Sequence, residues 1–192
     1  MAILTDDSVF GPDSVIHDTV NDRDFLRLDF TTPYTYAEVQ GELGAGGAFE
    51  GWQIASVVNL EGLGSSVGIT HGSADPGQLA LAEQLRDWFC PAATCVRTTT
   101  THEYARGLVS KGLSGVGQLA FSIGRRFNVN PHELDFRLSG NGGVNSRGEQ
   151  IYLTREAGPP IPEPSGALLF VLGSVVFGGA TRRRARACGG RG

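Results

Sequence analysis

Apolar and polar residues alternate along two stretches that are therefore expected to form strands. Between residues 25 and 30, Leu26, Leu28 and Phe30 fall on one face and the polar residues Arg27 and Asp29 fall on the other. This period of two is typical of a half-buried strand. Near residue 150, Gln-Ile-Tyr-Leu-Thr-Arg is rich in β-prone side chains and predicts the strand that closes the folded region.

Capping residues predict where two helices begin. Thr35 with Glu38 three positions later fits a capping box, and Gly44 is a suitable residue for the helix end. Asp75 and Pro76 predict a second helix, with Asp as N-cap and Pro in the first turn, which ends near Cys90-Pro91. The apolar stripes expected on the two helices are Tyr36, Val39 and Leu43, and Leu81, Leu85 and Trp88.

Weaker patterns fill the rest of the folded region. Ser14–His17 and Thr98–Thr101 are strand candidates, and Gly46–Ser56 is a glycine turn that leads into a short strand. Gly115–Gly124 fits a strand or a helix, and Asn141-Gly142 indicates a turn. The chain holds 28 glycines and is 40% hydrophobic. These features predict an α+β fold: one mixed, loop-rich domain over residues 1–157.

The last part of the chain has three segments of different physical character. Residues 158–165 are proline-rich and are expected to form a stiff linker. Residues 166–181 carry no charge, and residues 182–192 begin with a cluster of arginines. As a helix the uncharged run would be about 24 Å long, which becomes a feasible transmembrane helix if the flanking arginines snorkel. The alternative is a buried C-terminal core helix, but such a helix is rarely apolar on all sides.

The tail resembles the PEP-CTERM protein-sorting signal of Gram-negative bacteria. The resemblance rests on a Pro-Glu-Pro-Ser motif, an apolar helix and a basic cluster in that order. The residues concerned are Pro162, Glu163, Pro164 and Ser165 as the motif, and Arg182, Arg183, Arg184 and Arg186 as the basic stop. In that family the tail is recognised by exosortase, a membrane cysteine protease-transpeptidase expected to cut near the motif.

The resemblance implies a substrate of exosortase and says nothing about what the domain itself does. The residues show no evident catalytic set, so an enzyme is not expected and no cofactor is predicted. The expected partners are exosortase, the inner membrane and exopolysaccharide, whose production the same genomes usually encode. By the positive-inside rule the arginines stay cytoplasmic and the domain before the linker is periplasmic. After processing, the protein is expected at the cell surface or outside the cell, in a structural or interaction role.

The domain itself is similar to the outer domain of many PEP-CTERM proteins. The similar stretches are Asp18–Asp29, the helix at Tyr34–Leu43 and Gly47–Ala55. The sequence departs from that pattern at Gln53, where the family has arginine, and at Ser56, where it has threonine. A more distant likeness is to C-type-lectin-like domains, which implies a surface carbohydrate-binding module as the alternative function.

Charge is divided unevenly between the domain and the tail. Up to Glu163 there are 20 acidic and 11 basic residues, a formal net charge of −9, and after it there are five basic and no acidic residues. An acidic domain repels phosphates, so nucleic acid is not an expected partner. The basic tail is better explained by membrane topology.

Cys90 and Cys95 are close enough in sequence to form a small local disulfide, the favoured interpretation for an exported protein. The alternatives are two free thiols or half of a zinc site, and no second pair of ligands supports a metal. Cys188, beyond the arginines, is expected to stay unpaired.

The start of the given sequence, Met1-Ala-Ile-Leu-Thr-Asp-Asp-Ser, does not look like a signal peptide. Either the start is misassigned and a signal lies upstream, or the protein is a tail-anchored cytoplasmic protein. The first alternative is favoured, because residues 3 to 30 already have the pattern of a domain interior.

Other chemistry is weakly indicated. Trp52 and Trp88 are candidates for stacking on sugar, although tryptophan in an apolar pattern is usually part of a core. Gly115 and Gly117 match a dinucleotide fingerprint, which requires a strand before it and a helix after it, and a nucleotide-dependent enzyme is the third hypothesis. The aspartates among residues 6–24 lack the order of a calcium loop, and the histidines are isolated, so no metal site is predicted.

Overall fold

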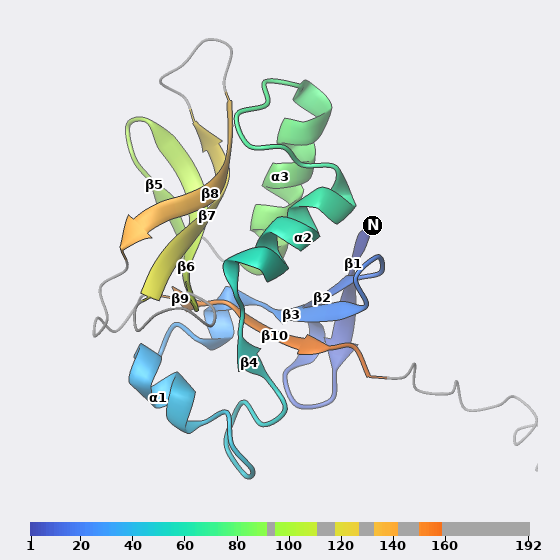
Figure 1. The fold of residues 1–192 in the computed structure, drawn as a ribbon, viewed down its shortest axis with the longest axis vertical. Coiled ribbons are helices and arrows are strands. Elements are labelled where there is room, and N and C mark those ends of the chain that lie inside the picture. Colours follow the sequence, from blue (N-terminus) through green and yellow to red (C-terminus); the bar gives the residue numbers. More distant parts are fainter. Residues whose placement is uncertain (92–94, 111–117, 127–132, 142–149, 159–192) are drawn as a thin grey trace, which may run out of the picture. The chain divides into compact units, whose positions relative to one another are not determined.

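The computed structural model describes residues 1–91, 95–110, 118–126, 133–141 and 150–158. These residues have a mixed α+β architecture with two five-stranded sheets and three α-helices (Figure 1). The fold class expected from the sequence is confirmed at this level.

The N-terminal sheet has the strand order β1-β2-β3-β10-β4, with antiparallel neighbours. Its strands are β1 (Ala2–Asp7), β2 (Gly11–Asp18), β3 (Arg23–Leu26), β4 (Gln53–Ile54) and β10 (Leu153–Glu156). The last strand within the described residues therefore lies between two strands formed early in the sequence. This insertion makes β10 a closing strand, as the sequence predicts for this region.

The second sheet has the strand order β5-β6-β7-β8, and β9 pairs with β6 in parallel. Its strands are β5 (Val96–Thr98), β6 (His102–Ser110), β7 (Gln118–Arg126), β8 (Glu133–Asn141) and β9 (Gln150–Ile151). Because β9 and β10 are separated only by Tyr152, one short segment joins both sheets. Tyr152 is fully buried, donates its N–H to Leu108 and accepts a hydrogen bond from Ala55.

The helices are α1 (Tyr36–Gly41), α2 (Val57–Val67) and α3 (Pro76–Phe89), and Leu28–Phe30 forms a short 3-10 helix. The capping box of α1 is confirmed, with Thr35 and Glu38 bonded reciprocally. Asp75 caps α3 and Pro76 lies in its first turn, as expected. The helix α2 is not predicted above, although it begins with a reciprocal Ser56–Asn59 capping box.

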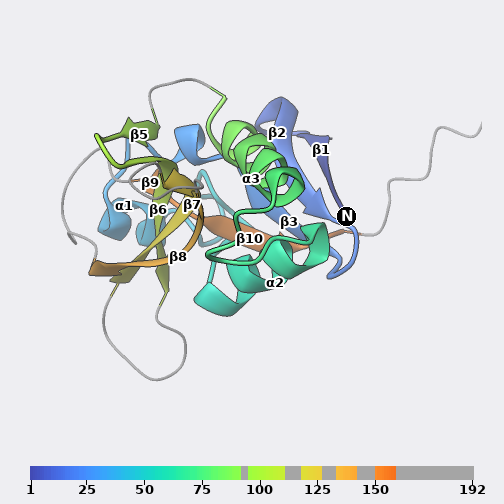
Figure 2. The same ribbon diagram turned by 90° about the horizontal axis from the view of Figure 1, so that it is seen from above.

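Two clusters of buried side chains form the core. The larger one lies between α2, α3 and the two sheets, and α3 packs against β6, β7 and β8 (Figure 2). The smaller cluster lies on the other face of the N-terminal sheet, where Phe49 and Trp52 pack near Val39 of α1. Both faces of this sheet are therefore covered, in keeping with buried residues at consecutive positions along β2 and β3.

Four details of the sequence prediction are wrong. Of the strand candidate Thr98–Thr101, only Thr98 is in a strand, because β5 covers Val96–Thr98. The strand expected at residues 25 to 30 ends at Leu26, because the chain turns there into the 3-10 helix. The first helix ends at Gly41 rather than Gly44. On α3 the buried stripe is Ala82, Leu85 and Phe89, while Leu81 is 39% exposed, so the helix is rotated relative to the expected stripe.

Residues 1–157 form one compact unit. Among the described residues no helix is both long and apolar enough to span a bilayer. The uncharged segment 166–181, for which the sequence predicts a transmembrane helix, lies outside the described residues.

Candidate functional site

The residues expected to carry the sorting signal are not placed by the structure. The motif Pro162, Glu163, Pro164 and Ser165 and the arginines 182, 183, 184 and 186 lie outside the described residues. What the structure places is the surroundings of Cys90, Cys95 and Trp52.

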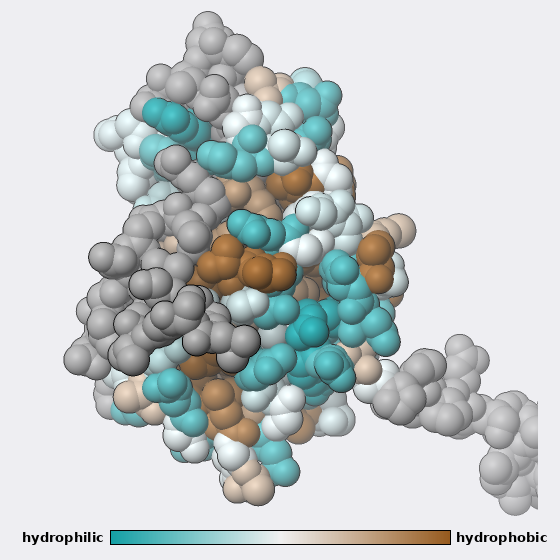
Figure 3. All heavy atoms as spheres, viewed as in Figure 1, coloured by the Kyte–Doolittle hydropathy of each residue, from teal (hydrophilic) through white to brown (hydrophobic). Residues whose placement is uncertain are grey.

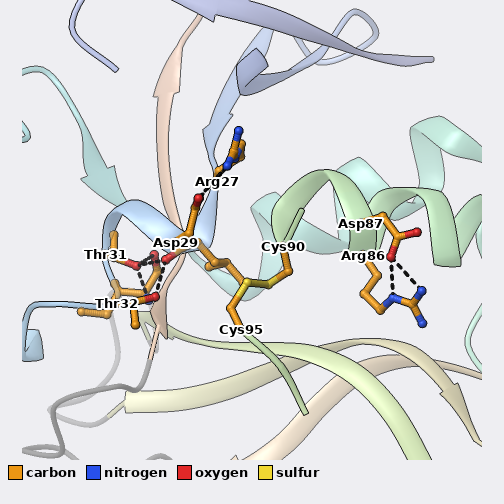
Figure 4. The surroundings of a disulfide bond; sticks show 10 residues. Arg27, Asp29, Thr31, Thr32, Arg86, Asp87, Cys90 and Cys95 are labelled. Carbon is orange, nitrogen blue, oxygen red and sulfur yellow. Dashed lines mark hydrogen bonds and ion pairs between the residues drawn. A yellow bond between two sulfur atoms is a disulfide. The ribbon is translucent and has the colours of Figure 1, made fainter. Parts of the chain in front are cut away.

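Cys90 and Cys95 are joined by a disulfide (Figure 4). Cys90 is the C-cap residue of α3 and Cys95 immediately precedes β5, so the bond connects the end of the helix to the start of the second sheet. The two residues are 3% and 1% exposed and belong to the larger core cluster. The bond therefore has a structural position, without an exposed sulfur for exchange or metal binding.

An ion-pair network holds the same helix to the same sheet. Arg86 of α3 contacts Glu103 of β6 at 3.2 Å, and Glu103 also contacts Arg125 of β7 at 3.2 Å. Arg125 returns to Glu83 of α3 at 2.7 Å. Because Arg86 is largely buried, its charge requires such a partner. The network and the disulfide together fix α3 along the sheet.

Trp52 is 5% exposed and packs in the smaller core cluster. The Arg155 guanidinium lies 4.3 Å from the centroid of its ring, which covers one face of the indole. Of the two roles that the sequence allows for Trp52, sugar contact and core packing, its position fits core packing. Trp88 is half-buried and lines a surface pocket that also includes residues of β1.

Arg155 is the centre of a charged cluster at the end of β10. Its Nε lies 3.0 Å from Asp24 of β3, and a terminal nitrogen lies 2.8 Å from Asp7 of β1. The other Asp24 oxygen contacts Nδ1 of His17 at 2.9 Å. One arginine thus ties three strands of the N-terminal sheet together.

The pKa of Asp7 is lower than its ordinary value. Burial acts to raise this pKa, but the N–H groups of Val9 and Phe10 and the Arg155 guanidinium all bind the carboxylate and outweigh the burial. The ionised form of Asp7 is therefore the one that the fold stabilises.

Two of the aspartates considered as calcium ligands, Asp7 and Asp18, bind groups of their own turns. Asp7 binds backbone N–H groups in the turn after β1, and Asp18 accepts from Val20 and from the side chain of Asn21. In the part of the chain that the structure describes, no three His, Cys, Asp or Glu side chains are grouped as metal ligands. The imidazole of His71 accepts a hydrogen bond from the backbone N–H of Phe136.

The dinucleotide fingerprint lacks its structural context. Gly115 and Gly117 lie outside the described residues, but the segment that follows, Gln118–Arg126, is strand β7. A phosphate-binding fingerprint requires a helix at this point, whose N-terminus holds the pyrophosphate. The described residues therefore give no support for nucleotide binding by this mechanism.

Partly exposed aromatic rings gather around Phe10, in the turn between β1 and β2. The Phe10 ring centroid is 5.1 Å from that of Phe30 and 5.9 Å from that of Phe49, and Tyr34 packs edge-on against Phe49. Phe10, Phe30 and Tyr34 keep part of their surface accessible. These rings, rather than Trp52, present aromatic surface on this side of the sheet.

No family model, no curated protein and no solved structure matches this chain.

The contacts of Arg155 and the Arg86 network are not predicted above. Each joins residues that are distant in sequence, and an isolated arginine in a strand or helix gives no sign of its partner. The sole local signal for Arg155 is its position in the closing strand.

Proposed function

We propose that this chain is an exported cell-envelope or extracellular-matrix protein, sorted through a PEP-CTERM tail that exosortase processes. The observation that carries the proposal is the order of three segments: the motif at residues 162–165, the uncharged run at 166–181 and the arginines after it. The uncharged run crosses the inner membrane as a helix, with the arginines in the cytoplasm. The compact unit acts by being placed at the surface, in a structural or interaction role.

The buried disulfide supports an exported location. Disulfides persist in the periplasm and outside the cell, whereas cytosolic thiols are kept reduced. Cys90 and Cys95 are bonded inside a core cluster, where the bond contributes to structure. This favours export over the tail-anchored cytoplasmic alternative.

Processing is tested by a matched pair of glutamate substitutions. The full chain, with a secretory signal peptide fused ahead of Met1, is produced in a host with exosortase and in the same host without it. We expect loss of the C-terminal segment, measured by intact mass, in the first host only. Glu163→Gln is expected to abolish the cleavage, while Glu156→Gln, at the end of β10, leaves it unchanged. Equal processing of both variants would exclude residues 162–165 as the motif that exosortase recognises.

Topology is tested separately, with Cys188 as a built-in probe. In intact spheroplasts a membrane-impermeant maleimide is expected to leave Cys188 unlabelled until the cells are lysed, because the residue follows the cytoplasmic arginines. A Val58→Cys variant provides the positive control, since Val58 lies on α2 and is 73% exposed. Labelling of Cys188 before lysis would contradict the proposed orientation.

A second candidate function is a lectin-like carbohydrate-binding module, for which exopolysaccharide is the candidate ligand. The observation that favours it is the group of accessible aromatic rings around Phe10, since aromatic faces stack on sugars. Glycan-array binding of the full chain is expected to fall at least about tenfold with Phe10→Ala, corresponding to roughly 1.4 kcal/mol. Val9→Ala is the neighbouring control, because Val9 is 76% exposed. Absence of glycan binding by the unmodified chain would end this candidate.

A further inference from the structure

An apolar pocket lies where the beginning of β1 meets the end of α2 and one side of α3. Its volume is about 410 Å³, within the usual range of ligand pockets. A dry apolar cavity of about 150 Å³ already holds benzene, so this pocket has room for a longer hydrocarbon group. The apolar side chains that line it include Ile3, Leu4, Val67, Leu81, Leu85 and Trp88.

The lining of the pocket offers no charged side chain. Among the described residues that form it, the polar side chains are those of Ser66 and Gln84, and none comes from Asp, Glu, Lys, Arg or His. The terminal nitrogen of Met1 lies at the border, where it donates to the carbonyl of Ser66 at 3.2 Å. A charged group inside the pocket would lose its hydration without gaining a charged side chain as partner, so an uncharged hydrocarbon fits best.

Exposed apolar side chains surround the mouth of the pocket. Met1, Ile3 and Leu81 line it and are 71%, 39% and 39% exposed. Val20, which is 64% exposed, lies in the adjoining turn, where the N–H of Thr19 bonds to the carbonyl of Met1. Figure 3 shows hydrophobic surface next to the beginning of β1. Exposed apolar residues gathered beside an apolar pocket are typical of an interaction site.

The same end of the N-terminal sheet is the one from which the chain leaves the compact unit. A row of paired residues crosses the sheet there, from β1 to β10: Ala2, Asp18, Arg23 and Glu156. Ala157 follows, and its N–H bonds to the turn between β2 and β3. Figure 2 shows the beginning of β1 and the end of β10 on the same side of the unit.

Under the proposed function, this arrangement tethers the pocket close to the membrane. The linker of residues 158–165 leads directly into the uncharged run that crosses the bilayer. Fully extended, these residues span at most about 28 Å. The end of the unit that carries the pocket is therefore the end that cannot move far from the lipid surface.

We infer that the pocket takes up an acyl chain of a bilayer lipid, an inference that rests on the proposed membrane anchoring of the tail. The acyl chain enters between β1 and α3, and the exposed side chains of Ile3 and Leu81 then contact hydrocarbon instead of water. Exposed carboxylates at this end, Asp22 and Glu156, do not attract anionic headgroups, so the contact depends on hydrocarbon. This second membrane contact fixes the orientation of the unit on the bilayer while the tail is still attached.

Trp88 provides a probe inside the pocket, because bromine atoms on a lipid chain quench a tryptophan that they touch. The chain has two tryptophans, so a Trp52→Phe variant leaves Trp88 to report alone. The full-length variant is placed in nanodiscs of phosphatidylcholine with or without bromine on the acyl chains. We expect the brominated lipid to lower its fluorescence at least about twofold. The fluorescence of Trp88→Phe should change little, because Trp52 is buried beneath Arg155.

Two further substitutions, each made in the Trp52→Phe chain, test the mouth of the pocket. Leu81→Glu places a charge at the rim and is expected to reduce the quenching at least about twofold. Val58→Glu makes a similar change at an exposed site on α2 that does not line the pocket, and should be quenched like its parent. Circular dichroism checks that both variants fold.

Three results would overturn the inference. The first is an unquenched Trp88 in nanodiscs that retain the chain, and the second is quenching that Leu81→Glu does not reduce. The third is quenching by dibromostearic acid, with the chain held in an amphipathic polymer, but not by the brominated lipid. That result would identify a free fatty acid, whose carboxylate meets the nitrogen of Met1, as the occupant. All three leave the proposed function intact, whereas a chain that does not stay with the nanodiscs would contradict the membrane-spanning tail as well.

Discussion

At the scale of single residues, Arg155 shows how one side chain can hold a sheet together. It contacts carboxylates from β1 and β3 and covers the Trp52 ring, although it lies far from all three in sequence. Asp7 is its most buried partner, with a side chain only 4% exposed. A charge in this position is stable because it is bound on every side, by Arg155 and by two backbone N–H groups.

Asp7→Asn is expected to lower the free energy of unfolding by about 1–3 kcal/mol near neutral pH, because it removes charge-assisted hydrogen bonds from a buried site. The folded-state pKa of Asp7 lies below the ordinary value of 3.8. The carboxylate therefore stabilises the fold fully above pH 3.8, and this contribution is lost as the pH falls toward the folded-state pKa.

The measurement is urea unfolding of the unmodified chain and the variant across a range of acidic pH. The difference between them should shrink as the pH falls. Asp22→Asn is the control, since Asp22 is an exposed turn residue. Parallel stability curves for the chain and Asp7→Asn would contradict the role assigned to Asp7.

At the scale of elements, α2 and α3 are fixed to the sheets in different ways. The helix α3 is fastened by a disulfide and by ion pairs, whereas α2 depends on close packing. Gly64 of α2 lies against the ring of Phe136 in β8, and a Cβ there would clash with a carbon of that ring. Gly62, two residues earlier in α2, has space for a methyl group, because the atom nearest to a Cβ there, in the side chain of Asn21, is 3.5 Å away.

Alanine is therefore expected to have opposite effects at these two glycines. Gly62→Ala should raise the free energy of unfolding by about 0.5–1 kcal/mol, since alanine is the better helix former. Gly64→Ala should lower it by about 1–3 kcal/mol, because the Phe136 ring has to move within a packed core. Thermal unfolding of the two variants decides the matter, and stabilisation by both would show that α2 does not pack this closely.

Removing the disulfide is expected to reduce stability by about 2 kcal/mol, the loop-closure entropy of a short cross-linked segment. The two cysteines are five positions apart. The double variant Cys90→Ala and Cys95→Ala is compared with Cys188→Ala in urea unfolding. Equal stability of these two variants would mean that the bond does not constrain the chain.

At the scale of the whole molecule, the compact unit is closed by its final strands. Residues 150–156 supply β9 to one sheet and β10 to the other, so both sheets depend on the last part of the unit. The residues after 157 fall outside this unit. Folding of the unit should therefore depend on β10 and not on the tail.

Two truncations are expected to behave differently. A chain that stops after Gly158 should unfold at nearly the same urea concentration as the full chain. A chain that stops after Gln150 should fail to fold, because it loses β10 from between β3 and β4 together with the buried Tyr152. Circular dichroism and tryptophan fluorescence report both results. If removal of residues 159–192 unfolded the chain, the tail would be part of the core and not a sorting signal.

Local signals in the sequence predicted several elements correctly. The caps at Thr35 and Asp75 start α1 and α3 as expected, and the α+β class follows from mixed periodicities. These features depend on hydrogen bonds and side chains within a few residues, so a short stretch of sequence contains them. The sorting tail likewise rests on local order and charge, and it remains a proposal from sequence.

The tertiary structure alone decided which distant residues meet. It placed β10 between β3 and β4, buried Trp52 beneath Arg155, and left β1 at the edge of its sheet next to an apolar pocket. It also rotated α3 so that Leu81 lies at that pocket instead of in the core. Such pairings depend on how strands and helices pack over more than a hundred residues of separation, and no periodicity within one element specifies its partner.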